Sequence, residues 1–128
     1  MAGTTTSNFR LIINNGSTVG STFDTTSQSI TATMTGTHIS ANVQTIPTTA
    51  GGTAITITSG VATYGMAYFQ NQDLVNYVSF GVKVSGTYYP IGRLLAGEEG
   101  LFRLDPTTTL YALANTASIN LYTVISEA

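Results

Sequence analysis

The residues that could perform chemistry are few, and none is arranged like a known active site. His38 is the only histidine and cysteine is absent, which excludes a zinc site and a thiol nucleophile. Residues 16–20, Gly-Ser-Thr-Val-Gly, carry threonine where a nucleophile elbow has serine. No Gly-Lys-Ser/Thr phosphate loop occurs. We therefore expect His38 to be a surface strand residue and the protein not to be an enzyme.

The acidic residues suggest two further sites, each with a simpler alternative. Glu98 and Glu99 are a pair of carboxylates, as a glycosidase requires, but neighbours in a glycine-bounded turn usually point apart. Asn71, Asp73 and Asn76 could offer oxygens to calcium, although their spacing matches no known calcium loop. The sequence thus predicts no catalytic residue, no metal ligand and no cofactor.

Two arginines are better candidates for contacts. Arg93 and Arg103 lie among apolar neighbours, on segments expected to be adjacent strands. Asp105 or Glu98 could pair with them in a salt bridge on a sheet face. The alternative is a contact between subunits, where arginine is favoured.

One pair of tyrosines could bind a ligand. Tyr88 and Tyr89 stand directly before Pro90. In a sugar-binding module such rings would stack on pyranose faces, whereas ordinary packing is the alternative.

The composition indicates a protein whose surface is covered by other protein. Only 8% of the 128 residues are charged and the net charge is −2, compared with about 25% charged residues in typical domains. Four basic residues cannot form a nucleic-acid surface, and no apolar run is long enough to span a membrane. Residues 1–8 lack the features of a secretory signal. Before Asp73 the only charged residues are Arg10 and Asp24, so the first half can meet a partner without desolvating ions.

Alternating apolar residues predict strands along most of the chain. The clearest is 76–84, which places Val78, Phe80, Val82 and Val84 on one face; Ser85 and Gly86 then form a hairpin turn. Other strands are expected at 9–13, 29–35, 38–46, 53–58, from 64, and at 87–95, 101–104, 110–113 and 118–125. Turn residues recur every 8–12 positions, which is typical of all-β folds. We expect a flexible N-terminal arm at 1–8 and a single all-β domain at 9–128, an antiparallel β-sandwich of about eight to ten strands, jelly-roll-like.

Part of the chain resembles small β-rich structural proteins of tailed bacteriophages. The segment 71–81, Asn-Gln-Asp-Leu-Val-Asn-Tyr-Val-Ser-Phe-Gly, is similar to an N-x-D-x-x-N-Y/F-V-x-x-G pattern in those proteins. Similar downstream segments are 88–90, 93–98, 101–104, 110–112 and 114–117, and 44–46 is a similar upstream segment. The resemblance covers roughly 43–125. It implies a non-enzymatic virion component with a jelly-roll or related sandwich fold, and it supplies no catalytic residues.

Together these observations predict a capsid decoration or cement protein. It would be a homo-oligomer that binds the major capsid protein and resides in the virion after assembly in the host cytoplasm, with no nucleic-acid or membrane partner. A neck or tail component, or a glycan- or receptor-binding fibre-head module, are the alternatives. The residues expected at interfaces are Phe9, Arg10, Thr31, Thr33, Tyr88, Tyr89, Arg93 and Arg103.

Overall fold

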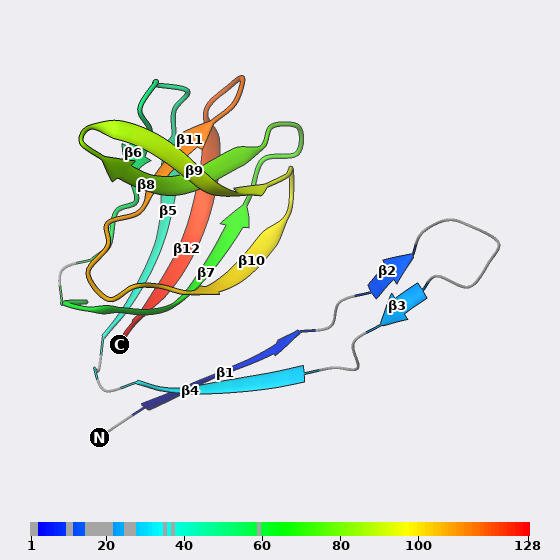
Figure 1. Cartoon of the computed structure of the whole chain (residues 1–128), viewed down its shortest axis with the longest axis vertical. Helices are drawn as coiled ribbons and strands as arrows, with labels where there is room; N and C mark the ends of the chain where they lie inside the picture. The colour runs from blue at the N-terminus through cyan, green and yellow to red at the C-terminus, as the bar shows by residue number, and fades with distance from the viewer. Residues whose placement is uncertain are drawn as a thin grey trace.

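Every described element of the chain is a β-strand (Figure 1). The computed structural model describes the backbone of residues 3–9, 12–14, 22–24 and 28–34, and backbone and side chains of residues 36, 38–58 and 60–128. Within these residues there is no helix, and hence none that could cross a membrane. The strands are β1 (Gly3–Phe9), β2 (Ile12–Asn14), β3 (Thr22–Asp24), β4 (Gln28–Met34), β5 (Ile39–Ile46), β6 (Thr53–Ala54), β7 (Tyr64–Asn71), β8 (Val78–Val84), β9 (Thr87–Leu94), β10 (Glu99–Arg103), β11 (Tyr111–Ala114) and β12 (Ile119–Glu127).

Strands β5 to β12 form two antiparallel four-stranded sheets, which confirms the expected all-β sandwich. One sheet has the order β10-β7-β12-β5 and the other β6-β11-β8-β9. The pairs are nested along the chain: β5 pairs with β12, β6 with β11, β7 with β10 and β8 with β9. The segment is therefore one long hairpin, folded so that its successive pairs alternate between the two sheets.

The hairpin of β8 and β9 follows directly from its sequence. Ser85 and Gly86 both have positive φ, 49° and 83°, as a two-residue turn of type I′ requires. The register shifts near Gly81, which is paired with Pro90. A Cβ at Gly81 would lie 2.0 Å from the carbonyl oxygen of Tyr89, so only glycine allows the two backbones to approach this closely.

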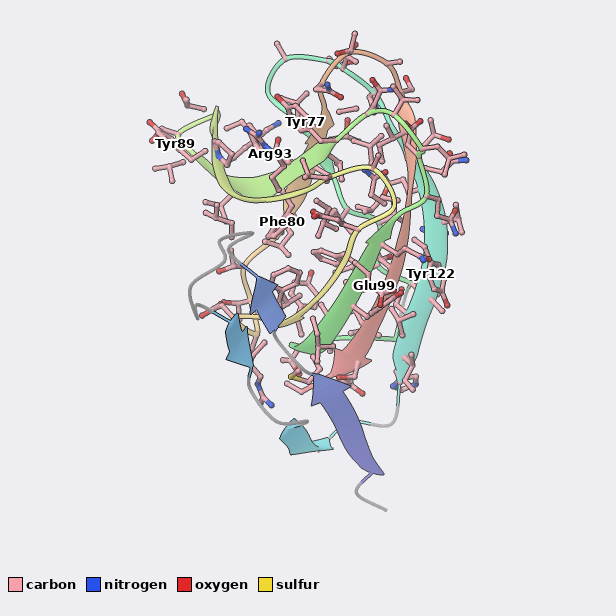
Figure 2. All side chains as sticks on the ribbon, turned by 90° about the vertical axis from the view of Figure 1, so that its right-hand side faces the viewer. Tyr77, Phe80, Tyr89, Arg93, Glu99 and Tyr122 are labelled. Carbon is pink, nitrogen blue, oxygen red and sulfur yellow. The ribbon has the colours of Figure 1, made fainter. Side chains whose placement is uncertain are left out.

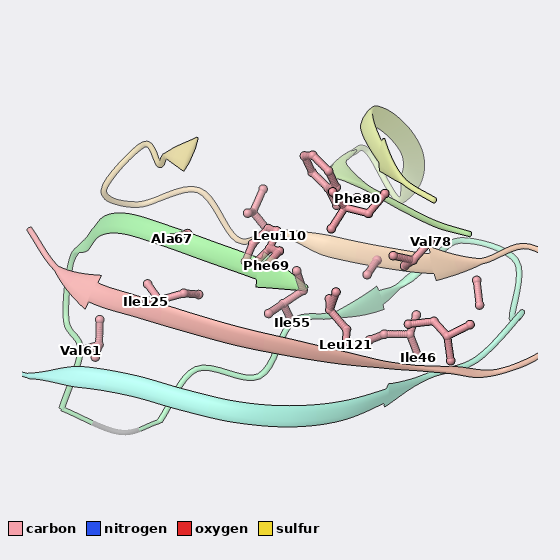
Figure 3. Packing of buried hydrophobic residues seen from close by; sticks show 14 residues of the cluster. Ile46, Ile55, Val61, Ala67, Phe69, Val78, Phe80, Leu110, Leu121 and Ile125 are labelled. Carbon is pink, nitrogen blue, oxygen red and sulfur yellow. The ribbon is translucent and has the colours of Figure 1, made fainter. Parts of the chain in front are cut away.

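The core lies between the two sheets (Figure 3). Phe69 of one sheet contacts Phe80 of the other, with ring centroids 5.7 Å apart, and Phe102 packs on both rings. Truncating a buried phenylalanine costs about 3–5 kcal/mol, so this cluster contributes strongly to holding the sheets together. The inward positions of β12 are Ile119, Leu121 and Ile125, as the alternation predicted.

Most of the strand predicted at 53–58 does not pair with a neighbouring strand. Only Thr53 and Ala54 pair with a neighbouring strand. The Ile55 N–H still donates to the Leu110 carbonyl at 2.9 Å. Beyond it, side chains of β5 bind the backbone instead: Gln44 Oε1 accepts the Thr56 N–H at 2.8 Å, and Ser40 Oγ accepts the Thr58 N–H at 2.9 Å. The other strands predicted from residue 29 onward agree with the structure to within two residues at each end.

Strands β1 to β4 pair only with one another. β1 pairs with β4 and β2 with β3, and neither pair joins the two larger sheets. Figure 1 shows both ladders beside the sandwich. The strand expected at 9–13 is replaced by β1, which ends at Phe9, and by β2. The division of the chain at residue 8 stays a prediction.

Candidate functional site

A hollow of about 390 Å³ lies on the outer face of the sheet β6-β11-β8-β9. Val78 and Phe80 of β8 face the core, so the alternate residue, Ser79, faces outward with its cross-strand partners Arg93 and Leu113. The hollow thus combines strand residues with the end of the loop before β8. Its lining is Tyr77, Ser79, Tyr88, Pro90, Gly92, Arg93 and Leu113.

Arg93 lies over an aromatic ring and makes no salt bridge with any residue whose side chain the structure describes. Its guanidinium carbon lies 4.2 Å from the centre of the Tyr77 ring, and Figure 2 shows the two side chains together. The expected pairing with Glu98 or Asp105 is wrong. The Glu98 carboxylate instead accepts the Leu95 N–H at 2.7 Å, and no acidic side chain within the described residues lies within 4.0 Å of Arg93.

Arg93 and Arg103 do not lie on adjacent strands, contrary to the sequence-based expectation. β9 belongs to one sheet and β10 to the other, where β10 pairs with β7. The turn between them therefore crosses from sheet to sheet. Only Arg93 lines this hollow; Arg103 borders a smaller hollow of about 220 Å³ beside Leu104 and Asp105.

Tyr88 and Tyr89 do not form one cluster, because neighbours in a strand face opposite sides. Tyr88 lies in the hollow, where its hydroxyl is 3.0 Å from Ser79 Oγ. Burial raises the pKa of Tyr88, and the hydrogen bond to Ser79 offsets part of that shift. The ring packs over Gly52, whose φ is 69° and where a Cβ would be 3.0 Å from the ring. Tyr89 pairs with Val82 on the other face and is half-exposed.

A second cation lies on this outer face. Lys83 Nζ is 4.4 Å from the centre of the Tyr111 ring. Lys83 and Arg93 are the only charged residues in the four strands of this sheet. The face therefore carries positive charge, supported by tyrosine rings, and no carboxylate of its own.

The outer surface of the opposite sheet differs sharply. Its strands β5, β7 and β12 present no charged side chain there; we refer to this surface as the charge-free face. Val43, midway along the edge strand β5, is 50% exposed, and Tyr68 meets Tyr122 edge to face with ring centroids 6.1 Å apart. Its members are Ala41, Val43, Thr45, Met66, Tyr68, Gln70, Asn120, Tyr122 and Val124.

Charges appear on this sheet's outer side only at the edge strand β10. Glu99 pairs with Gln70 and Arg103 with Met66. The Tyr68 hydroxyl donates a hydrogen bond to Glu99 Oε2. That bond, together with burial and the negative charge of Glu99, raises the pKa of Tyr68 to about 12. The phenol therefore remains protonated and satisfies the one carboxylate beside the charge-free face.

The polar residues at 71–76 hold a loop together through hydrogen bonds from their side chains to the backbone. Asn71 is fully buried, and its Nδ2 donates to the carbonyls of Asn76, Leu94 and Leu95 at 2.8, 3.3 and 3.0 Å. Asp73 Oδ1 accepts the N–H groups of Asn76 and Val75, which lower its pKa. No group of three possible metal ligands occurs within the part of the chain that the structure describes.

His38 lies where the chain enters the sandwich. Its side chain is 58% exposed, which confirms the predicted surface position. Its Nδ1 is 3.1 Å from Glu127 Oε2, and Glu127 Oε1 also accepts the Ala62 N–H at 3.3 Å. A Cβ at Gly36 would overlap the Glu127 side chain. These contacts hold the first residues of the sandwich against its last strand.

The remaining predicted interface residues lie in the N-terminal region. Phe9 ends β1, whereas Thr31 and Thr33 of β4 pair with Thr6 and Thr4. The side chains of all three, and Arg10 altogether, fall outside the described residues. So does the Asn-Gly-Ser sequence at 15–17, which matches the N-glycosylation triplet. The interface roles of Phe9, Arg10, Thr31 and Thr33 stay predictions.

Sequence reasoning missed most of the hollow, although the signal was present. The alternation of 76–84 already placed Tyr77, Ser79 and Lys83 on the same face. What the sequence lacked was the partner strand: β11 brings Leu113 and Tyr111 to this face from thirty residues downstream.

Comparison of the chain with protein-family models, curated proteins and solved structures gave no match in any of the three.

Proposed function

We propose that the chain is a non-enzymatic structural component of a bacteriophage virion, a decoration or cement protein that binds the major capsid protein as a homo-oligomer. The observation that carries the proposal is the charge-free face. Three neighbouring strands present nine outward residues without a formal charge. The resemblance of residues 43–125 to phage structural proteins supports the same assignment.

The physical argument rests on desolvation. An ion that is buried in an interface without a partner costs several kcal/mol, and monomers ordinarily keep charged surfaces to stay apart. The charge-free face can be covered without that cost, while Val43, Tyr68 and Tyr122 supply apolar area. An interface of about 1,600 Å² is the usual size for a specific complex, and many copies on one particle increase the overall affinity by avidity.

We also propose that the sandwich is a jelly roll. The support is the nesting of its four strand pairs, from β5 with β12 to β8 with β9, across two four-stranded sheets. Eight strands in two sheets is the architecture of jelly rolls, which include viral capsid domains. Strands β1 to β4 form two separate two-stranded ladders. Because a two-stranded ladder is marginally stable on its own, we propose that these strands pack against a neighbouring subunit.

The test introduces one charge into the charge-free face. Val43→Glu places a carboxylate within this face, midway along β5, and Val84→Glu is the matched control, because Val84 is 57% exposed and lies in the other sheet. Binding is measured by co-sedimentation with particles purified from the virus that encodes the chain. We expect at least tenfold weaker binding for Val43→Glu, which corresponds to about 1.4 kcal/mol. The thermal stability of both variants should be unchanged, and the control Val84→Glu should bind fully.

Three results would contradict the proposal: full binding by Val43→Glu, an equal loss from Val84→Glu, or particles that do not contain the protein. Retention on tails but not on capsids would favour a neck or tail component instead. A glycan- or receptor-binding fibre-head module remains a second candidate, because the hollow beside Arg93 offers it a binding site.

A further inference from the structure

The hollow on the sheet β6-β11-β8-β9 has features that assembly does not require. It lies on the opposite side of the sandwich from the charge-free face, and its volume of about 390 Å³ is in the range of small-ligand sites. Its walls mix aromatic and aliphatic side chains with a hydroxyl pair and a guanidinium. Such a lining suits a ligand that has both a ring and a negative charge.

The anion would bind at Arg93. This side chain is exposed, lies over the Tyr77 ring, and has no ion-pair partner among the residues with described side chains. Its guanidinium makes no hydrogen bond to those residues either, and two of its N–H groups can match the two oxygens of a carboxylate. Stacking also limits the rotamers of Arg93, which reduces the entropy lost on binding.

The surrounding charges favour the same ligand. Lys83 adds a second positive charge on this face, and none of the sheet's strands carries an acid. Asp73, in the loop before β8, directs Oδ1 at the backbone N–H groups of Val75 and Asn76. Two cations attract one or two negative charges but are too few for a nucleic-acid backbone.

The rest of the hollow fits a sugar ring. Tyr88 is half-buried with its hydroxyl bonded to Ser79, and Pro90 and Leu113 complete an apolar surface around it. Rings and aliphatic groups of this kind contact the C–H faces of a pyranose, while the hydroxyls of Tyr88 and Ser79 can exchange hydrogen bonds with sugar hydroxyls. We propose that this hollow binds an acidic pyranose, a uronic or sialic acid residue of a glycan, with its carboxylate on Arg93.

The experiment compares pairs of sugars that differ in the acidic group. The purified full chain is titrated by NMR with methyl glucuronide against methyl glucoside, and with sialyllactose against lactose. We expect at least one acidic member to bind at least tenfold more tightly than its neutral partner. Arg93→Gln should reduce that binding at least tenfold. Arg103→Gln, which removes the same charge from the other sheet, should change it less than twofold.

Several outcomes would overturn the proposal. These are equal binding of acidic and neutral sugars, equal losses from Arg93→Gln and Arg103→Gln, or binding of an acidic peptide carboxylate by a chain that binds none of the four sugars. Thermal unfolding of each variant shows whether it is folded, and Tyr88→Phe, which keeps the ring, is a second and milder variant. Because Arg93→Gln leaves the charge-free face intact, it should still bind particles, so this inference and the proposed function fail separately.

Discussion

Replacing Asn71 by aspartate tests the account of the loop that links β7 to β8. The Asn71 side chain is fully buried and joins three segments, since its two N–H groups serve the carbonyls of Asn76, Leu94 and Leu95. Its Oδ1 accepts the Asp73 N–H at 3.1 Å. Asn71→Asp keeps the shape of the side chain and the oxygen that accepts the Asp73 N–H. In place of Nδ2, however, it turns a carboxylate oxygen, charged at neutral pH, toward three carbonyl oxygens.

The expected cost follows from these contacts. Losing the hydrogen bonds of two N–H groups costs about 2 kcal/mol, and leaving a buried carbonyl such as that of Leu94 unpaired costs a further 1–3 kcal/mol. We therefore expect a loss of about 3–5 kcal/mol at pH 7, which is a large share of the stability of a small domain, about 5–15 kcal/mol. Repulsion from the carbonyls acts in the same direction.

The pH dependence has a definite sign. Burial and neighbouring carbonyls disfavour the charged form, so the pKa of the substituted carboxyl is raised in the folded protein. A group with a raised folded pKa stabilises the fold below its unfolded pKa of about 4, and that contribution is lost as the pH rises through the folded value. The deficit of Asn71→Asp should therefore be smaller at pH 3.5 than at pH 7.

Urea unfolding followed by far-ultraviolet circular dichroism measures both effects. Asn115→Asp is the matched control, because Asn115 is exposed and its side-chain Nδ2 donates only to the neighbouring Thr116 hydroxyl within the described residues. The control should change stability by less than about 0.5 kcal/mol at either pH. A loss below 1 kcal/mol for Asn71→Asp at pH 7, or a deficit that grows on acidification relative to the control, would refute the reasoning.

Two further predictions concern single contacts. In a spectrophotometric titration at 295 nm, Glu99→Gln should move one tyrosine from a pKa of about 12 toward its ordinary value of 10.0, because Tyr68 loses a charged acceptor. The stabilising contribution of that phenol is present below pH 10 and is lost as the pH rises through about 12; an unchanged titration curve would contradict the contact. Gly81→Ala should cost about 3 kcal/mol in urea unfolding, because its Cβ overlaps the Tyr89 carbonyl, and a cost below 1 kcal/mol would argue against the register.

The local part of the fold was readable from the sequence. The hairpin of β8 and β9 has alternating residues on both sides of Ser85 and Gly86, and each strand's face follows from a period of two. The failures concern relations between distant segments. Nothing local indicates that the turn after Leu94 crosses to the other sheet, so Arg93 and Arg103 were placed together when the fold separates them.

The alternation of apolar residues also cannot predict where side chains of one strand bind the backbone of a neighbouring segment. Residues 55–58 alternate as a strand does, yet the N–H groups of Thr56 and Thr58 donate to side chains of β5. For the candidate site, the sequence pointed to Tyr88 and Arg93. It grouped Tyr88 with Tyr89 and Arg93 with Arg103, and the fold separates both pairs. Tyr89 is excluded from the hollow by strand geometry, and Tyr77 became identifiable only through its stacking on Arg93.

The position of the last strand has a consequence for how the protein is made. β12 lies between β5 and β7, and its end pairs with the start of β5, Ser126 opposite Ile39. During synthesis β5 and β7 must therefore wait, without their central neighbour, until residues 119–127 have been translated. Closing so long a loop slows folding and exposes strand edges meanwhile. A ribosome stalled before residue 119 would hold an open, aggregation-prone half-sandwich, whereas the emergence of residues 119–127 would let the sheet close in one step.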